Sequence, residues 1–205
     1  MTKKERYIKW LQNGEIDKFN RYRQLLYRYN VNSMDLRRAD LRNADLCRAD
    51  LWRADLWRAD LYKSNLRNAV LWRADLRNAD LRSADLYDTN LYDADLKNAD
   101  LKNADLKNAH LKNAHLRNAD LCNIRGKHIY KTSGNGRVGR DIWYILEDDY
   151  IQAGCWSGSL KEFLKKVEET YGHDKKGYEY QSYQDVIEYY QKKKDRYDKG
   201  VSNEC

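Results

Sequence analysis

The sequence lacks proline altogether, and it lacks the features that would place it among membrane, secreted or disulfide-rich proteins. The absence of proline excludes proline-rich linkers and a collagen-like chain. No apolar run approaches the roughly 18 residues that span a membrane. The polar start, Met1–Arg6, is not the pattern of a signal peptide. The four cysteines form no CxxC pair, which fits a reduced, cytoplasmic setting.

Positive charge is in moderate excess and is concentrated near the N-terminus. Lys and Arg number 39 against 32 Asp and Glu, which gives a formal net charge of +7. Residues 1–30 hold +5 of this excess, residues 31–126 hold +2, and residues 127–205 are neutral. The balance favours anionic partners without identifying one.

A five-residue repeat dominates the chain. Leucine occupies every fifth position from Leu36 to Leu121, eighteen times without a miss. Ala precedes Leu by two residues from position 39 onward, with only Ser64 and Thr89 in its place, and Asp usually lies between them. Five residues turn an α-helix by about 500°, so the leucines would spiral around it. In a straight strand, an odd period would send them to alternate faces. A chain that turns a corner every five residues buries them all.

The repeat pattern A(D/N)LXX resembles the pentapeptide repeat family over about 90 residues. The resemblance implies a right-handed, four-sided β-helix with four pentapeptides per coil, whose two ends need caps. Residues twenty apart would then stack on one face. We therefore expect a mainly β fold with a helical cap over residues 1–30, a β-helix over residues 31–126 and a small α/β module over residues 127–205.

The N-terminal cap is predicted to contain two helices within residues 2–29, separated at Asn13-Gly14. Thr2 and Glu5 fit a capping box at the start of the first helix. The basic side chains expected on the outer, solvated face are those of Arg21, Arg23 and Arg28. The apolar residues expected to face inward are Ile8, Leu11, Ile16, Phe19, Leu25 and Leu26.

The C-terminal module shows no five-residue period. Its predicted strands are Ile129–Lys131, Ile142–Leu146 and Tyr150–Cys155, with a tight turn at Gly134-Asn135-Gly136. One helix is predicted to start at a Ser159/Glu162 capping box and to stop at Gly172, and another is predicted near residues 181–197. Val186, Ile187 and Tyr190 are expected to face inward. The stretch from Gly154 to Gly172 resembles an uncharacterised module of phage and prophage proteins, which implies no activity.

Aromatic and arginine residues gather on two adjoining faces of the N-terminal coils if the four-sided geometry applies. On the first of these faces the column before Leu keeps Asp50 but then has Val70, Asn90 and His110 in place of Asp, which is expected to leave the face locally positive around Arg53 and Arg73. Trp and Arg are enriched at binding hot spots, and they stack on bases and hold phosphates. Stacking between successive coils would explain the aromatic residues equally well. The residues of the predicted binding surface are Trp52, Arg53, Trp57, Arg58, Trp72, Arg73 and Tyr92.

These features predict a non-enzymatic binding protein that needs no cofactor or metal. The expected partner is an anionic, nucleotide-type small molecule or a host protein, and direct binding of duplex DNA is not expected. The phage resemblance favours an anti-defence role in the cytoplasm of a bacterial host, as a sponge for a nucleotide signal or an inhibitor of a host protein. The sequence leaves a homo-oligomer open.

Two alternatives belong to other functional classes. Fluoroquinolone-resistance members of the pentapeptide repeat family resemble duplex DNA through acidic faces and engage type II topoisomerases. Here Arg42, Arg82 and Lys102 lie beside a continuous acidic column, which disfavours mimicry. That column contains Asp40, Asp60, Asp80, Asp100 and Asp120.

The second alternative is an enzyme with Cys155 as a nucleophile, since a helix N-terminus lowers a thiol pKa. His128 or His173 would have to supply the base, and the sequence does not bring either close to Cys155. His110 and His115 occupy Asp positions on adjacent faces. No further ligand is spaced to join them, so they are interpreted as surface substitutions and not as a metal site.

Overall fold

The computed structural model describes residues 1–28, 34–133, 141–153, 156–175 and 178–199. The chain divides into two compact units, Met1–Lys127 and His128–Cys205. No helix within the described ranges is long and apolar enough to cross a membrane.

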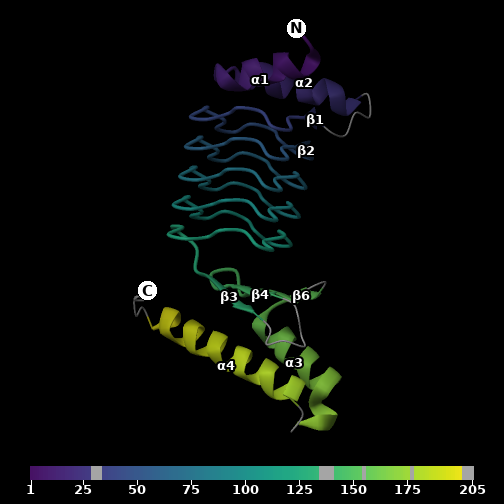
Figure 1. The fold of residues 1–205 in the computed structure, drawn as a ribbon, viewed down its shortest axis with the longest axis vertical. Helices are drawn as coiled ribbons and strands as arrows, with labels where there is room; N and C mark the ends of the chain where they lie inside the picture. Colours follow the sequence, from purple (N-terminus) through teal and green to yellow (C-terminus); the bar gives the residue numbers. More distant parts are fainter. Residues whose placement is uncertain (29–33, 134–140, 154–155, 176–177, 200–205) are drawn as a thin grey trace. The chain divides into compact units, whose positions relative to one another are not determined.

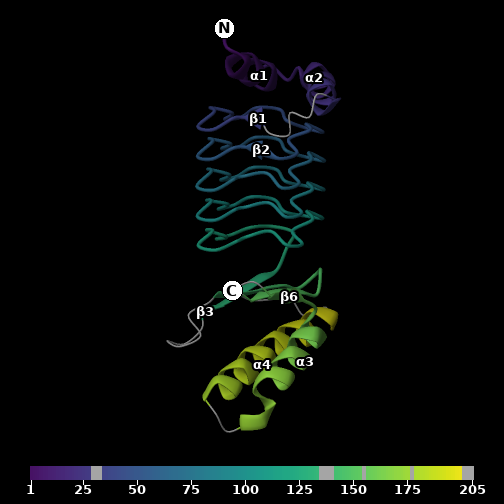
Figure 2. The ribbon, with the colours of Figure 1, turned by 90° about the vertical axis from the view of Figure 1, so that its right-hand side faces the viewer.

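The first unit is built around a stack of coils, each twenty residues long (Figures 1 and 2). Parallel bridges join each coil to the next, as between Asp40 and Asp60 and between Asp60 and Asp80. β1 (Met34–Asp35) pairs with β2 (Ala54–Asp55) in the same register. Each coil also donates backbone hydrogen bonds to the next, such as Leu36 N to Asp55 O at 2.8 Å. This twenty-residue register corresponds to four five-residue repeats per coil, as the resemblance implied.

A β-turn at every repeat makes the corners of the coils. The Ala N–H donates to the carbonyl of the preceding Leu, as in Ala39 N to Leu36 O at 3.0 Å. The third turn residue has a positive φ of 52–62° in all eighteen repeats. Asn fills that position in nine of them, and Asn tolerates the left-handed region better than most residues. The Asp before Leu accepts the N–H two residues on, as in Asp55 Oδ1 to Trp57 N at 3.2 Å.

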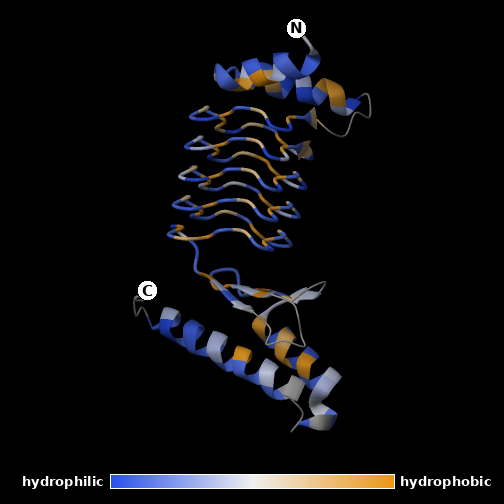
Figure 3. Cartoon of the chain, in the orientation of Figure 1, coloured by the Kyte–Doolittle hydropathy of each residue, from blue (hydrophilic) through white to orange (hydrophobic). Residues whose placement is uncertain are grey.

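The interior of the coils contains the repeated Leu and Ala side chains. Every repeat leucine from Leu36 to Leu111 is fully buried, and the apolar positions recur along each coil in Figure 3. Ser64 and Thr89 take inward Ala positions, and Thr89 Oγ1 donates to Leu66 O at 2.7 Å. The five-residue period therefore forms the core, as predicted.

Two helices lie over the first coil (Figure 1). α1 (Lys3–Gln12) begins at the predicted capping box of Thr2 and Glu5, and α2 is Ile16–Arg28. Leu11 and Phe19 are fully buried, as expected. Leu25 was expected to face inward and is instead 48% exposed. The interior faces of the two helices are therefore narrower than the sequence pattern indicates.

Polar side chains of the helices, and not only apolar ones, seal the first coil. The carbonyls of this coil have no preceding coil to donate to them, and a buried carbonyl without a donor is costly. Gln12 Nε2 donates to Asp40 O at 2.8 Å, and Lys4 Nζ donates to Arg37 O at 2.8 Å. These side chains supply hydrogen-bond donors to backbone carbonyls at the N-terminal end of the stack.

The burial of Arg23 differs from the sequence prediction. Arg23 was expected on the outer basic face, but it is only 4% exposed. Its guanidinium donates to Asp50 O at 3.1 Å and also to Trp52 O. The phase of α2 therefore turns this cation toward the first coil, where it caps two carbonyls.

The second unit is an antiparallel sheet with two helices. Its strands follow the order β3-β4-β5-β6, and α3 begins at the predicted Ser159/Glu162 capping box. The described part of the predicted third strand, Tyr150–Ala153, is a strand, whereas Gly154 and Cys155 lie outside the described residues, as does the predicted turn at Gly134-Asn135-Gly136. The elements are β3 (Ile129–Ser133), β4 (Asp141–Ile145), β5 (Tyr150–Ala153), β6 (Trp156–Gly158), α3 (Leu160–Tyr171), η1 (Gly172–Asp174) and α4 (Tyr178–Asp198).

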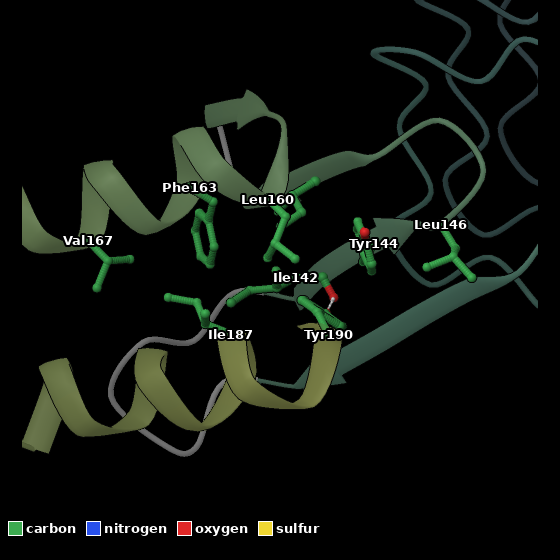
Figure 4. Packing of buried hydrophobic residues seen from close by; sticks show 9 residues of the cluster. Ile142, Tyr144, Leu146, Leu160, Phe163, Val167, Ile187 and Tyr190 are labelled. Carbon is green, nitrogen blue, oxygen red and sulfur yellow. Dashed lines mark hydrogen bonds between the residues drawn. The ribbon is translucent and has the colours of Figure 1, made fainter. Parts of the chain in front are cut away.

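The core of this unit lies between the sheet and the helices (Figure 4). Ile187 and Tyr190 of α4 are buried as predicted, and Val186 is partly buried. Tyr190 Oη donates to Ile142 O at 2.9 Å, and burial raises the pKa of Tyr190, so its hydroxyl stays protonated. The buried cluster consists of Ile142, Tyr144, Leu146, Ile151, Leu160, Phe163, Val167, Ile187 and Tyr190.

Candidate binding surface

The predicted surface of Trp52, Arg53, Trp57, Arg58, Trp72, Arg73 and Tyr92 is called the Trp/Arg surface below. Trp52 and Trp72 lie one coil apart and stack, with centroids 5.7 Å apart and ring planes inclined by 21°. Tyr27 of α2 also packs against Trp52, at 5.6 Å between centroids. Both tryptophans are half-buried. The stacking interpretation is therefore confirmed for this pair, and part of each indole remains exposed.

An arginine guanidinium lies over each tryptophan of this surface. Arg53 lies 5.0 Å from the centroid of Trp52, and Arg73 lies 4.8 Å from that of Trp72. Trp57 has two such neighbours, Arg58 at 4.8 Å and Arg38 at 5.1 Å. Arg38 was not among the predicted site residues, although its position twenty residues before Arg58 could have placed it there. These cation–π contacts hold the guanidinium groups in fixed orientations.

Arginines at the position directly after Leu are neutralised by neighbouring carboxylates. Arg42 contacts Asp40 with two nitrogens, at 2.8 and 2.6 Å, and Asp60 at 3.5 Å. The hydrogen bond from Arg42 lowers the pKa of Asp40 to about 2, so the carboxyl stays ionised. Arg82 contacts Asp80 in the same way. The acidic column is therefore charge-paired, which argues against mimicry of DNA.

Arginines at the corner position differ, because most have no carboxylate partner among the described residues. Arg38, Arg53 and Arg58 contact tryptophan and form no ion pair in that part of the chain. Arg73 is the exception, since its Nε lies 3.1 Å from Asp93 Oδ2. The expectation that the first face is positive around Arg73 was therefore wrong. The signal missed in the sequence was the Asp twenty residues later.

Asp93 remains a carboxylate despite its partial burial. Burial alone raises its pKa, but hydrogen bonds from Asn113 and Arg73 outweigh that effect and lower the pKa. Asn113 also donates to the hydroxyl of Tyr92 at 3.2 Å. The charge of Arg73 is thus balanced by Asp93 within the Trp/Arg surface. The arginines of this surface that lack a carboxylate partner among the described residues lie in the first two coils.

The turn geometry gives no reason for arginine at these corners. Arg38, Arg53 and Arg58 have φ of 56, 52 and 56°, in the region where Asn is favoured and long side chains gain nothing. The same left-handed φ recurs at the corner of every repeat, so it does not distinguish these three arginines. What they share is contact with a tryptophan ring.

An open pocket of about 540 Å³ lies between α2 and the first face of the coils. Sequence analysis missed it, because it assigned the α2 side chains Arg23 and Arg28 to an outer face. Val70 contributes an exposed apolar side chain, 36% accessible. This pocket is called the α2 pocket below. The residues that line it are Arg23, Gln24, Tyr27, Arg28, Asp50, Trp52 and Val70.

Val70 also removes a hydrogen bond that other repeats have. Asn65 and Asn90 accept the N–H two residues later, at 3.2 and 3.1 Å, and valine cannot accept the N–H of Trp72. We expect Val70→Asn to stabilise the protein by about 0.5–1.5 kcal/mol, the net value of one added hydrogen bond. Urea unfolding measures the change. A Val70→Ala variant controls for loss of the valine, and equal or lower stability of Val70→Asn relative to it would contradict the prediction.

The remaining predicted groups lie elsewhere. His110 and His115 are exposed, and no three potential metal ligands lie together among the described residues. Cys47 and Cys122 are free thiols. Cys155, the nucleophile of the enzyme alternative, lies outside the described residues.

Comparison with known proteins agrees with the geometry of the coils. Residues 35–73, 59–98 and 89–125 match the family model of pentapeptide repeats. The crystal structure of alr5209, a pentapeptide repeat protein from Nostoc Pcc 7120, is 38% identical over 47% of this chain and 71% of that chain, with a TM-score of 0.20. Residues 35–125 of this chain are therefore pentapeptide repeats.

Other solved structures are similar over less than half of this chain. Rfr23, a pentapeptide repeat protein from the cyanobacterium Cyanothece 51142, is 33% identical over 42% of this chain, with a TM-score of 0.31. The chain spans 63% of Rfr23, less than two thirds of its length. QnrB1, a plasmid-mediated fluoroquinolone resistance protein, is 20% identical over 44% of this chain and 59% of its own, with a TM-score of 0.22. No curated protein matches the chain at a significant level.

Proposed function

We propose that this chain is a non-enzymatic binding protein that holds an anionic partner on the Trp/Arg surface. The observation that supports this most strongly is the set of corner arginines Arg38, Arg53 and Arg58. They stack on tryptophan and have no carboxylate partner among the described residues. The arginines Arg42 and Arg82, one position earlier in their repeats, are paired with aspartate.

The arrangement suits an anion for two physical reasons. A guanidinium held over an indole is already oriented, so less conformational entropy is lost when a partner binds. Its planar donors match the oxygens of a phosphate or carboxylate. With the phage-protein resemblance of the second unit, the surface supports an anti-defence role in a bacterial cytoplasm, through a nucleotide signal or a host protein.

The test compares two double variants that remove the same charge from different places. Arg53→Ala/Arg58→Ala removes unpaired arginines, and Arg42→Ala/Arg82→Ala removes paired ones. Binding of nucleotides and cyclic dinucleotides is measured by thermal shift and calorimetry, and binding of acidic host proteins by capture from bacterial lysate. We expect the first variant to bind roughly 30–100-fold more weakly, because two charge-assisted contacts are lost.

The matched control is expected to bind as the unmodified chain does. Equal binding by both double variants would reject the Trp/Arg surface as the site. Absence of any ligand or protein whose binding depends on Arg53 and Arg58, in either format, would reject the proposed function.

A further inference from the structure

We infer that the α2 pocket takes a nucleobase with an exocyclic amino group, so that the anionic partner is a nucleotide. The phosphate part of this inference rests on the proposed function, and the base part rests on the pocket alone. The pocket volume of about 540 Å³ lies within the range of small-molecule sites, roughly 300–1,000 Å³.

The apolar lining of the pocket suits a flat heterocycle. Tyr27 offers a ring on which a base can stack, because it is 65% exposed. Trp52 adds apolar surface, since its ring is already in contact with Trp72, Arg53 and Tyr27. Val70 adds an exposed branched side chain where other repeats have a polar residue. Aromatic and apolar side chains of this kind stack on bases without regard to which base it is. The apolar lining therefore accounts for affinity toward a flat ring, and discrimination between bases must come from polar groups.

Asp50 is the polar residue that can discriminate between one base and another. Its Oδ1 accepts the N–H of Trp52 at 3.2 Å, and its carboxylate forms no ion pair with a lysine or arginine among the described residues. Asp50 lines the pocket, and a carboxylate with one such contact retains acceptor capacity. A carboxylate reads an amino group on a base edge, and it repels a keto oxygen at the same place. The pocket should therefore prefer adenine, cytosine or guanine to hypoxanthine or uracil.

The surrounding charges argue against a purely cationic ligand. Tyr27, Trp52 and Asp50 alone would resemble an aromatic cage for an ammonium group. However, the buried guanidinium of Arg23 lies against the backbone carbonyl of Asp50, and Arg28 also lines the pocket. Arg53 lies over the ring of Trp52 and has no carboxylate partner among the described residues. A base in the pocket would place a phosphate within reach of this positive rim.

The experiment is calorimetric titration of the full chain with matched pairs of probes. The 5′-monophosphates of adenosine and cytidine are compared with those of inosine and uridine, and with adenosine, ribose 5-phosphate and choline. We expect each amino-bearing nucleotide to bind about tenfold more tightly than its keto counterpart, as one hydrogen bond to a charged group allows.

Two variants locate the effect. Asp50→Asn keeps the acceptor for Trp52 N–H and replaces the free carboxylate oxygen with a donor, so the preference should reverse toward keto bases. Asp45→Asn is the matched control, because Asp45 Oδ1 accepts Cys47 N–H at 3.1 Å in the equivalent turn outside the pocket. Val70→Phe fills the pocket and should abolish binding of adenosine while ribose 5-phosphate still binds.

Each outcome decides the inference. Equal binding of amino and keto nucleotides, an unchanged preference in Asp50→Asn, or tighter binding of choline would overturn it. If ribose 5-phosphate binds as well as the nucleotides and depends on Arg53, the pocket inference fails and the proposed function stands. If adenosine binds in a Val70-dependent manner and Arg53→Ala/Arg58→Ala leaves nucleotide binding unchanged, the base site stands and the anionic site fails. Binding of none of the probes rejects the nucleotide inference.

Discussion

Replacing Arg23 by leucine is expected to lower the free energy of unfolding by roughly 2–4 kcal/mol, since an unsatisfied buried polar group costs about 1–3 kcal/mol. Arg23 is 4% exposed and donates to the carbonyls of Asp50 and Trp52. Leucine would fill part of the space and leave both carbonyls without a side-chain donor from the described residues. Urea unfolding, followed by circular dichroism, measures the loss.

The control for this prediction is Arg21→Leu on the same helix. Arg21 is exposed, so its replacement should change the free energy of unfolding by less than about 0.5 kcal/mol. Hydrogen exchange should also show faster exchange in the first coil of the Arg23 variant than in later coils. Equal stabilities of the two variants would show that Arg23 does not cap the stack.

Truncating a central leucine is expected to have a still larger effect. Leu76→Ala should cost roughly 3–5 kcal/mol, at the upper end of values for buried leucines. Leu76 is fully buried, and the same position is filled by Leu56 one coil above and by Leu96 one coil below. Backbone bridges hold the coils at a fixed spacing, so they cannot move together to close the cavity. Urea unfolding measures the loss.

The position of the leucine within the stack provides the comparison. Leu116 is 2% exposed and lies near the last coil, so Leu116→Ala should cost less than Leu76→Ala. Arg77→Ala, next to Leu76 and exposed, should have little effect. A similar cost for Leu76→Ala and Leu116→Ala would mean that the stack relaxes around the cavity.

Several elements could be predicted from sequence because local chemistry or strict periodicity decides them. The period of five predicted a chain that turns a corner at every repeat, and the resemblance to pentapeptide repeats implied the twenty-residue coil whose register the parallel bridges show. The Thr2/Glu5 and Ser159/Glu162 capping boxes involve residues three apart, and both are present. The tryptophans of the Trp/Arg surface could be placed in columns because twenty residues make one coil.

The sequence by itself thus determined the repeating core, the corners and the helix starts, since each depends on residues within one repeat or one turn. Only the tertiary structure decided which charges are paired. Arg73 meets Asp93 across one coil, whereas Arg53 has no such partner in the described part of the chain. It also decided that Arg23 points toward the first coil and that α2 and Val70 border a pocket. These features depend on the phase at which a helix meets a coil, and contacts between residues distant in sequence set that phase.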